Sequence, residues 1–343
     1  MEPVKVIVVG ASGYAGEELV RLLLSHPHVH LVGVTSRQLK GKRLEESLNL
    51  LPLKSSLLFE DLTPSEIAQR AELVFLALPH GVASEFAVPL RQAGKIVVDL
   101  SADFRLQNAS VYREFYTSEH PAPSLLKEAV YANPTLHREA IQKSNLLAAP
   151  GCYPTSILLG LAPVLQAELI DPSTIIVNSL SGVSGAGKKA DLSIIYGEVN
   201  ENMRAYSVPK HRHLGELEQE IARLSGTHSN VTFVPHLVPL TRGMFTTIIA
   251  TLKKPITQDN VQSVYGKFYK QEPFVRVLTG DLLPEVKHVV RTNWCELAMR
   301  VDERTGRLMI FSVIDNLGRG AAGQAIQAMN IRMGFPEESG LSC

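Results

Sequence analysis

The chain has 343 residues, 45% of them hydrophobic and 20% charged, and this length exceeds what one hydrophobic core ordinarily organises, so we expect two domains. Its 34 Lys and Arg residues balance 34 Asp and Glu residues, which gives no overall field for binding nucleic acid or a membrane surface. Three widely spaced cysteines exclude a disulfide framework, and no apolar run reaches the roughly 18 residues of a membrane-spanning helix. The N-terminus lacks a signal-peptide pattern, so we expect a cytoplasmic protein.

The first 150 residues alternate short apolar strands with helical patterns. We expect strands at 4–9, 29–34, 73–78, 95–100 and 146–149. These strands are continuously apolar rather than alternating, which indicates burial on both faces, as in a parallel sheet covered by helices. Residues 1–150 are therefore predicted to form a doubly wound α/β (Rossmann) domain.

The pattern changes after Pro154. Helices are predicted at 156–170 and 214–225, and strands at 173–182, 231–238, 244–252, 293–302 and 307–315. Several strands with few helices between them predict an α+β substrate domain, residues 151–315, with a mostly antiparallel sheet. The last segment, 316–343, carries a helix rich in small residues, which we expect to return to the nucleotide domain.

A glycine-rich turn follows the first strand in "VVGASGYAGEEL". Gly10, Gly13 and Gly16 fall where a pyrophosphate can rest against the free amides of a helix N-terminus. The spacing is G-x-x-G-x-x-G rather than the commoner G-x-G-x-x-G, so a simple tight turn is the alternative.

The end of the second strand, "VGVTSRQLKGKR", contains no acidic residue for a ribose hydroxyl. Ser36, Arg37, Lys40 and Lys42 instead provide donors and positive charge that suit a 2′-phosphate. We therefore predict NADP(H), with Arg37 as the phosphate contact. A solvated basic loop is the alternative.

Cys152 lies in "AAPGCYPTS", after the last strand of the nucleotide domain. Pro154 suits the first turn of a helix, and a cysteine at a helix start faces unpaired amides that stabilise its thiolate and lower its pKa. We predict a nucleophile; the alternative is a small buried apolar residue. Cys295 alternates with apolar residues on a strand and is expected in the core, and Cys343 is expected to be incidental.

His211 and His213 stand two apart in "PKHRHLGELEQE", just before a helix. Imidazole is suited to proton transfer near neutral pH. Two alternatives are a zinc site shared with Cys152, for which no further Cys/His cluster is present, and a surface pair that caps the helix. We expect no metal.

The segment "SGVSGAGKK" fits G-x-x-x-x-G-K, but Lys189 stands where a phosphate loop needs Ser or Thr, so an ATPase is rejected. Lys188 is predicted to contact an anionic substrate instead. Arg105 and Arg242 are predicted to bind a carboxylate or phosphate; surface or structural ion pairs are the alternative for each.

A nicotinamide cofactor beside an activated thiol indicates reduction of an activated acyl group through a thioester to an aldehyde. The basic residues suggest that phosphate is the leaving group. Eight segments resemble those of the N-acetyl-γ-glutamyl-phosphate reductases, within the semialdehyde dehydrogenase family. They are "GASGYAGEEL", "LPHG", "DLSADFRL", "APGCYPTS", "SGVSGAGKK", "KHRHLGELEQE", "PHLVPLTRGM" and "DNLGRGAAGQAIQAMN".

The resemblance implies an NADPH-dependent enzyme of arginine biosynthesis that reduces N-acetyl-L-glutamyl 5-phosphate to the semialdehyde and phosphate. It implies Cys152 as nucleophile and His211 and His213 as the proton-transferring and substrate-orienting pair. It implies the cofactor contacts Gly10, Ser12, Gly13, Gly16 and Asn316. Together with Ser36 and Arg37 from the second strand, and with Tyr14, Ala15, Ser184 and Gly185, these are the expected cofactor-binding residues. We expect a homodimer or homotetramer.

Two positions depart from the family pattern. The segment from Tyr131 to Thr135 lacks the usual Gly-Leu-Pro-Glu after the tyrosine, and Arg319 replaces a usual lysine.

Three alternative functions remain open. They are reduction of aspartyl phosphate, as in aspartate-semialdehyde dehydrogenase, a lysine-pathway reductase of a carrier-linked acyl phosphate, and a non-catalytic NADP sensor.

Overall fold

The computed structural model describes residues 2–48, 55–188 and 190–341. It divides into two compact units, one made of residues 1–150 with 321–343 and the other of residues 151–320. Cys343 and Lys189 lie outside the described residues. No helix in the described parts of the chain combines the length and apolar character needed to cross a membrane.

The first unit contains a parallel sheet, as predicted. Its described strands run in the order β3-β2-β1-β4-β5-β7-β6, and every pair is parallel. The bounds are β1 Val4–Val9, β2 Val29–Thr35, β3 Phe59–Glu60, β4 Leu73–Leu76, β5 Ile96–Asp99, β6 Val130–Tyr131 and β7 Leu146–Ala148. In β1, residues 6–9 are at most 1% exposed, which explains why this strand is apolar without alternation.

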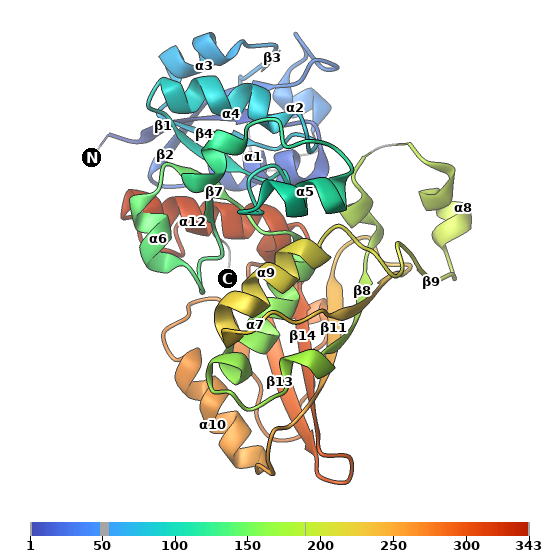
Figure 1. Ribbon diagram of the computed structural model, residues 1–343. Helices are drawn as coiled ribbons and strands as arrows, with labels where there is room; N and C mark the ends of the chain where they lie inside the picture. The colour runs from blue at the N-terminus through green and yellow to red at the C-terminus, as the bar shows by residue number, and fades with distance from the viewer. Residues whose placement is uncertain (1, 49–54, 189, 342–343) are drawn as a thin grey trace. The chain divides into compact units, whose positions relative to one another are not determined.

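Helices connect and cover these strands (Figure 1). Their bounds are α1 Tyr14–Leu24, α2 Leu44–Ser47, α3 Pro64–Arg70, α4 Ala83–Gln92, α5 Ala109–Tyr116, α6 Arg138–Lys143 and α12 Gly323–Met333. The last of these, α12, packs against α6 and α1 within the first unit. The strand order reverses direction at β1 and β4, the switch point at which doubly wound sheets bind ligands.

The second unit contains a mixed sheet in the order β12-β13-β14-β11-β8-β10-β9. Its bounds are β8 Ile176–Ser181, β9 Arg204–Ala205, β10 Thr232–Leu237, β11 Met244–Thr251, β12 Val275–Val277, β13 Cys295–Asp302 and β14 Arg307–Ile314. Four described pairs are antiparallel, as the sequence predicts, whereas β8 with β10 and β12 with β13 are parallel. The β8–β10 pair is parallel because α9 (Leu214–Ser225) provides the crossover between them.

Helix α7, Cys152–Gln166, packs on β11 and β14 beside α9 and α10 (Gln258–Phe268) (Figure 1). Gly160 allows close packing, because a Cβ there would lie 2.8 Å from Cδ1 of Ile248. Pro163 has no N–H for the carbonyl of Leu159, and the hydroxyl of Tyr269 donates to that carbonyl instead. The helix is thereby fixed along its length in the second unit.

Hydroxyl groups also hold α7 to the sheet near its first turns. The Oγ of Ser156 donates to Oγ1 of Thr246 and Oγ of Ser312, each at 3.0 Å, and Oγ of Ser179 lies 2.9 Å from the same Thr246 atom. All four side chains are fully buried. Cys295 lies beside this network with its sulfur 3.6 Å from Ser312 Oγ. It is a core residue, as predicted, and burial raises its pKa to about 11.

Candidate active site

The turn after β1 requires glycine at two positions. Gly10 has φ of +84°, and a Cβ there would lie 2.4 Å from the carbonyl oxygen of Ala77. A Cβ on Gly16 would lie 2.4 Å from the carbonyl oxygen of Gly10. Gly13 is the N-cap of α1, whose first turn has no side-chain cap. The turn is therefore built so that an anion can approach the backbone N–H groups of α1.

The end of β2 lies next to this turn. The Oγ of Ser36 donates to Oγ of Ser12 at 2.9 Å, which joins the two loops. Arg37 and the neighbouring lysines are exposed. The adjacent acidic residue, Glu60 on β3, is held by both terminal nitrogens of Arg70 at 2.8 Å. The exposed basic side chains at this end of the sheet suit a 2′-phosphate.

A second loop of the first unit follows β5. Asp103 is fully buried and accepts hydrogen bonds from the N–H of Gly81 at 2.6 Å and of Ser84 at 3.3 Å, so it fixes the start of α4. Arg105, in the same loop, is 8% exposed and donates from Nη2 to the carbonyl of Leu100 at 2.8 Å. Arg105 is therefore held by its own loop and is not an exposed surface side chain.

Cys152 is the first residue of α7 and is partly exposed, and Gly151 is the N-cap. The helix has no side-chain cap, and Pro154 lies within its first turn as expected. The sulfur therefore belongs to the open N-terminal turn of a 15-residue helix. Such a turn favours negative charge, which matches what a nucleophilic thiolate needs.

Glu216 joins Cys152's turn to the histidine pair. It lies on α9 and is fully buried; its Oε2 accepts the N–H of Gly151 at 3.0 Å. Its Oε1 lies 3.9 Å from Nε2 of His213. One carboxylate thus positions the residue before the cysteine and faces a histidine that can carry a proton.

His211 and His213 are both buried, and their ring centroids are 4.8 Å apart. The Nδ1 of His211 accepts the N–H of His213 at 3.1 Å, so the neutral ring of His211 carries its proton on Nε2. Burial, and secondarily Arg212, lowers the pKa of His211 to about 4. His211 is therefore a neutral hydrogen-bond donor. No group of three or more His, Cys, Asp or Glu side chains among the described residues is arranged to hold a metal.

Aromatic rings surround the histidine pair. The ring of Tyr153 lies 5.5 Å from that of His211 and 5.2 Å from that of Phe233. The hydroxyl of Tyr153 is 2.8 Å from that of Tyr206, whose ring is 5.7 Å from that of His211. Burial raises the pKa of Tyr206 to about 12. These rings desolvate His211 and keep it uncharged.

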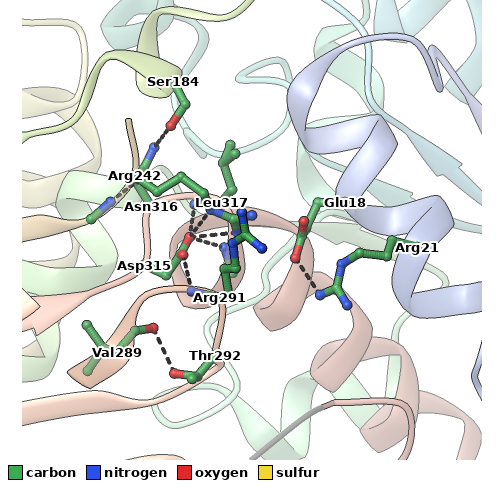
Figure 2. Close-up of polar contacts among 12 residues, drawn as sticks. Glu18, Arg21, Ser184, Arg242, Val289, Arg291, Thr292, Asp315, Asn316 and Leu317 are labelled. Atoms are coloured by element: carbon green, nitrogen blue, oxygen red, sulfur yellow. Dashed lines mark hydrogen bonds and ion pairs between the residues drawn. The ribbon is translucent and has the colours of Figure 1, made fainter. Parts of the chain in front are cut away.

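Arg242 and Asn316 lie in a second cluster of the same unit, drawn in Figure 2. Arg242 donates from Nη2 to Oδ1 of Asp315 at 3.0 Å. Asn316 donates from Nδ2 to Oγ of Ser184 at 2.9 Å and accepts the N–H of Gly243 on Oδ1 at 2.8 Å. The structure therefore brings together Ser184 and Asn316, two of the expected cofactor contacts, whereas Lys188 is exposed on its loop.

Two family models match the chain: the semialdehyde dehydrogenase NAD binding domain over residues 5–144 and the semialdehyde dehydrogenase dimerisation domain over residues 152–316. N-acetyl-gamma-glutamyl-phosphate reductase of Desulfotalea psychrophila is 49% identical over 339 residues, which is 98% of each chain. The protein of the same name from Moorella thermoacetica is 46% identical over 338 residues, again 98% of each chain. The chain belongs to the N-acetyl-γ-glutamyl-phosphate reductase family.

Solved structures of more distant semialdehyde dehydrogenases share the fold. Aspartate semialdehyde dehydrogenase II of Vibrio cholerae, complexed with ASA, has a TM-score of 0.75 at 17% identity and covers 97% of this chain and 99% of its own. The Candida albicans aspartate semialdehyde dehydrogenase with NADP has a TM-score of 0.71 at 16% identity and covers 96% and 98%. The chain is therefore an oxidoreductase of the semialdehyde dehydrogenase class with a nicotinamide-nucleotide binding domain.

Three carboxylates that were not predicted from the sequence hold backbone segments next to predicted site residues, each within its own unit. Glu216, Asp103 and Asp315 each accept backbone N–H groups from distant segments. Each lies inside a motif that carries the family resemblance, which was the available signal. At the Tyr131–Thr135 departure, buried Asn133 accepts the N–H of Thr135 at 3.2 Å and so closes the turn by itself. Arg319 is fully buried.

Proposed function

We propose that this reductase converts N-acetyl-L-glutamyl 5-phosphate, NADPH and a proton to N-acetyl-L-glutamate 5-semialdehyde, phosphate and NADP⁺, through a thioester on Cys152. One observation carries the proposal. Cys152 lies in the uncapped first turn of α7, and buried Glu216 links the residue before it to His213. The substrate is the one named by the relatives that are nearly half identical over 98% of the chain.

The first unit has the residues to hold NADP(H). Glycine at positions 10 and 16 is required by space, and the open start of α1 offers N–H groups to the pyrophosphate. Ser12, Tyr14 and Ala15 complete that turn, and Ser36 with Arg37 suits the 2′-phosphate. Gly185 would join Ser184 and Asn316 toward the nicotinamide. When bound, the cofactor supplies the hydride that reduces the acyl carbon.

The thiolate of Cys152 forms the S–C bond to the γ-carbonyl carbon, and the C–O bond to phosphate breaks with its electron pair leaving on the phosphate. The N–H groups of the first turn of α7 stabilise the oxyanion. After reduction, the thiohemiacetal collapses, the C–S bond breaks and the thiolate returns. The residues of this chain therefore serve twice, once in acylation and once in release of the aldehyde.

The two histidines have different roles. His213 faces the Glu216 carboxylate at 3.9 Å, and we assign it the proton transfer. His211 keeps its proton on Nε2 and donates a hydrogen bond to the substrate. Arg105 and Lys188 are assigned to the substrate's anionic groups. Arg242 acts on the same site through Asp315, to which its guanidinium is bound.

The family carries a dimerisation domain, and for this chain we infer a homodimer or homotetramer formed through the second sheet. On β11 and β14, Ile248 and Ile310 face α7, whereas Phe245, Ile249 and Phe311 alternate with them and are only partly buried. A large partly exposed apolar sheet face is typical of a subunit interface. In analytical sedimentation we expect the Phe311→Asp variant to be a monomer and the wild type to be an oligomer. An unchanged mass of the variant would contradict an interface on this sheet face.

The decisive experiment is the reverse reaction followed by NADPH absorbance. Purified protein is incubated with NADP⁺, phosphate and either N-acetylglutamate semialdehyde or aspartate semialdehyde. We expect sustained NADPH formation only with the first semialdehyde and only when phosphate is present, because without phosphate the thioester is not released. Turnover of aspartate semialdehyde would favour aspartyl-phosphate reduction, a requirement for a carrier protein would favour the lysine-pathway reaction, and NADP⁺ binding without turnover would indicate a sensor. We also propose a cytoplasmic location, because a reducing compartment keeps a reactive thiol reduced.

A further inference from the structure

Asp315 follows β14 and is fully buried. Its Oδ1 accepts the N–H groups of Leu317 and Gly318, each at 2.8 Å, in addition to Nη2 of Arg242 (Figure 2). Its Oδ2 accepts the N–H of Arg291 at 2.5 Å. A buried carboxylate with one ion-pair partner and three backbone donors fixes all the segments it binds, because displacing any of them costs a charge-assisted hydrogen bond.

The loop around Arg291 depends on this contact. Arg291 has φ of +66°, a left-handed conformation that is unfavourable for a residue with a side chain. Its N–H is the one that Asp315 accepts. The next residue, Thr292, packs closely against Gly318. A Cβ on Gly318 would lie 2.3 Å from the Thr292 carbonyl oxygen. Asp315 thus braces the turn from Asp315 to Gly320 and the loop behind it.

The same turn ends against the nucleophile. The N–H of Gly320 donates to the carbonyl of Asp315 at 2.9 Å. A Cβ on Gly320 would lie 2.8 Å from Cβ of Cys152 and 3.3 Å from its Cα. Gly320 is not among the residues with positive φ, so glycine is needed here for space and not for backbone conformation.

We propose that Asp315 and Gly320 are positioning residues for Cys152. Asp315 fixes the turn, and the missing side chain of Gly320 leaves the space that Cys152 occupies at the start of α7. The proposal rests on the proposed function for the role of Cys152 as nucleophile. It concerns residues that do not touch the reacting atoms, so their effect must pass through the placement of the thiol.

The test compares four full-length proteins: wild type, Gly320→Ala, Asp315→Asn and Gly266→Ala. Gly320→Ala adds one methyl group against Cys152. Asp315→Asn adds no heavy atom, removes the charge that holds Arg242, and replaces one of the two accepting oxygens with an NH2 donor. Gly266→Ala is the matched control, because its new Cβ on α10 would have nothing within 4 Å. The readouts are the thermal midpoint, kcat and KM in the reverse assay, NADPH affinity, and the rate at which iodoacetamide alkylates Cys152, measured on its peptide by mass spectrometry.

For Gly320→Ala we expect kcat to fall about 100-fold, with KM and NADPH affinity within about threefold, because a shift of about 1 Å misplaces a reacting group. Alkylation of Cys152 at pH 7 should slow about fivefold or more as the sulfur leaves the N–H groups of α7. Asp315→Asn should show the same pattern at about a tenfold loss of kcat. Gly266→Ala should match wild type.

Wild-type kcat and alkylation in folded Gly320→Ala would overturn the proposal. A loss of activity that matches the loss of folded protein would also overturn the proposal. If Gly320→Ala fails to fold, the same criteria are applied to Asp315→Asn. The alkylation rate needs no substrate. Slower alkylation in the variants together with an inactive wild type would therefore refute the proposed function and leave the positioning role standing.

Discussion

His211 offers a pH-dependent test of the site, and the perturbation is His211→Asn. The asparagine Oδ1 replaces Nδ1 as acceptor for the N–H of His213, which lies 3.1 Å away in the wild type. The asparagine is neutral at every pH used. The variant therefore keeps an acceptor for this hydrogen bond and removes the titratable ring, and stability rather than activity is the quantity compared.

The magnitude follows from the pKa of His211, about 4 in the folded protein against 6.5 for an unperturbed histidine. Between these values the unfolded chain binds a proton that the folded chain does not, so acid favours unfolding. The neutral, buried imidazole of His211 contributes fully to the free energy of unfolding above the unfolded pKa. This contribution is lost as the pH falls toward the folded pKa. From pH 8 to pH 5 the loss is about 2 kcal/mol.

The assay is urea denaturation of wild type and His211→Asn at pH 8 and pH 5. Between pH 8 and pH 5 the free energy of unfolding should fall by about 2 kcal/mol more for wild type than for the variant. The reason is that only wild type binds a proton on this imidazole when it unfolds. His228→Asn changes an exposed histidine, and its free energy of unfolding should match that of wild type at both pH values. An equal pH dependence in wild type and His211→Asn would refute a neutral, desolvated His211.

Three further predictions concern other parts of the site. Glu216→Gln should lower kcat about 10- to 100-fold by weakening proton transfer at His213. The control Glu220→Gln, at another buried glutamate of α9, should leave kcat near wild type. Equal losses of kcat in the two variants would show that both act only through the stability of the helix. Arg37→Ala should raise KM for NADPH about tenfold or more with little change for NADH, and equal changes for both cofactors would contradict a 2′-phosphate contact. Gly10→Ala should abolish tight NADPH binding, as titrated by fluorescence. Gly94→Ala also has positive φ (+74°) but no atom within 4 Å of its Cβ, and it should retain NADPH binding; similar losses in both would attribute the effect to φ alone.

The parallel sheet of the first unit was predictable because continuous apolar runs such as Val4–Val9 correspond to strands buried on both faces. The two-residue strands β3 and β6 were missed, because they are too short to show any periodicity. In the second unit, β8, β10, β11, β13 and β14 were predicted, whereas the short strands β9 and β12 were missed and the order of pairing was not predicted. The parallel β8–β10 pair depends on the crossover through α9, and no local pattern states which strands that crossover brings together.

The site was predictable where chemistry is local. Cys152 is flanked by residues that mark a helix start, and that helix begins at Cys152. Arg242 shows the limit: a bidentate guanidinium suits a substrate anion or a structural partner equally, and its partner Asp315 is 73 residues away. Asp315 and Glu216 were missed for the same reason, because each acts through backbone groups supplied by distant segments.

The most direct test of the covalent route is a single-turnover experiment with phosphate omitted. Enzyme, NADP⁺ and N-acetylglutamate semialdehyde should give one equivalent of NADPH and an enzyme whose mass has increased by one N-acetylglutamyl group, located on Cys152, and added phosphate should release it. Cys152→Ser should bind NADP⁺ yet show neither signal. A full NADPH yield with an unmodified Cys152, or full turnover by Cys152→Ser, would contradict a thioester on this residue.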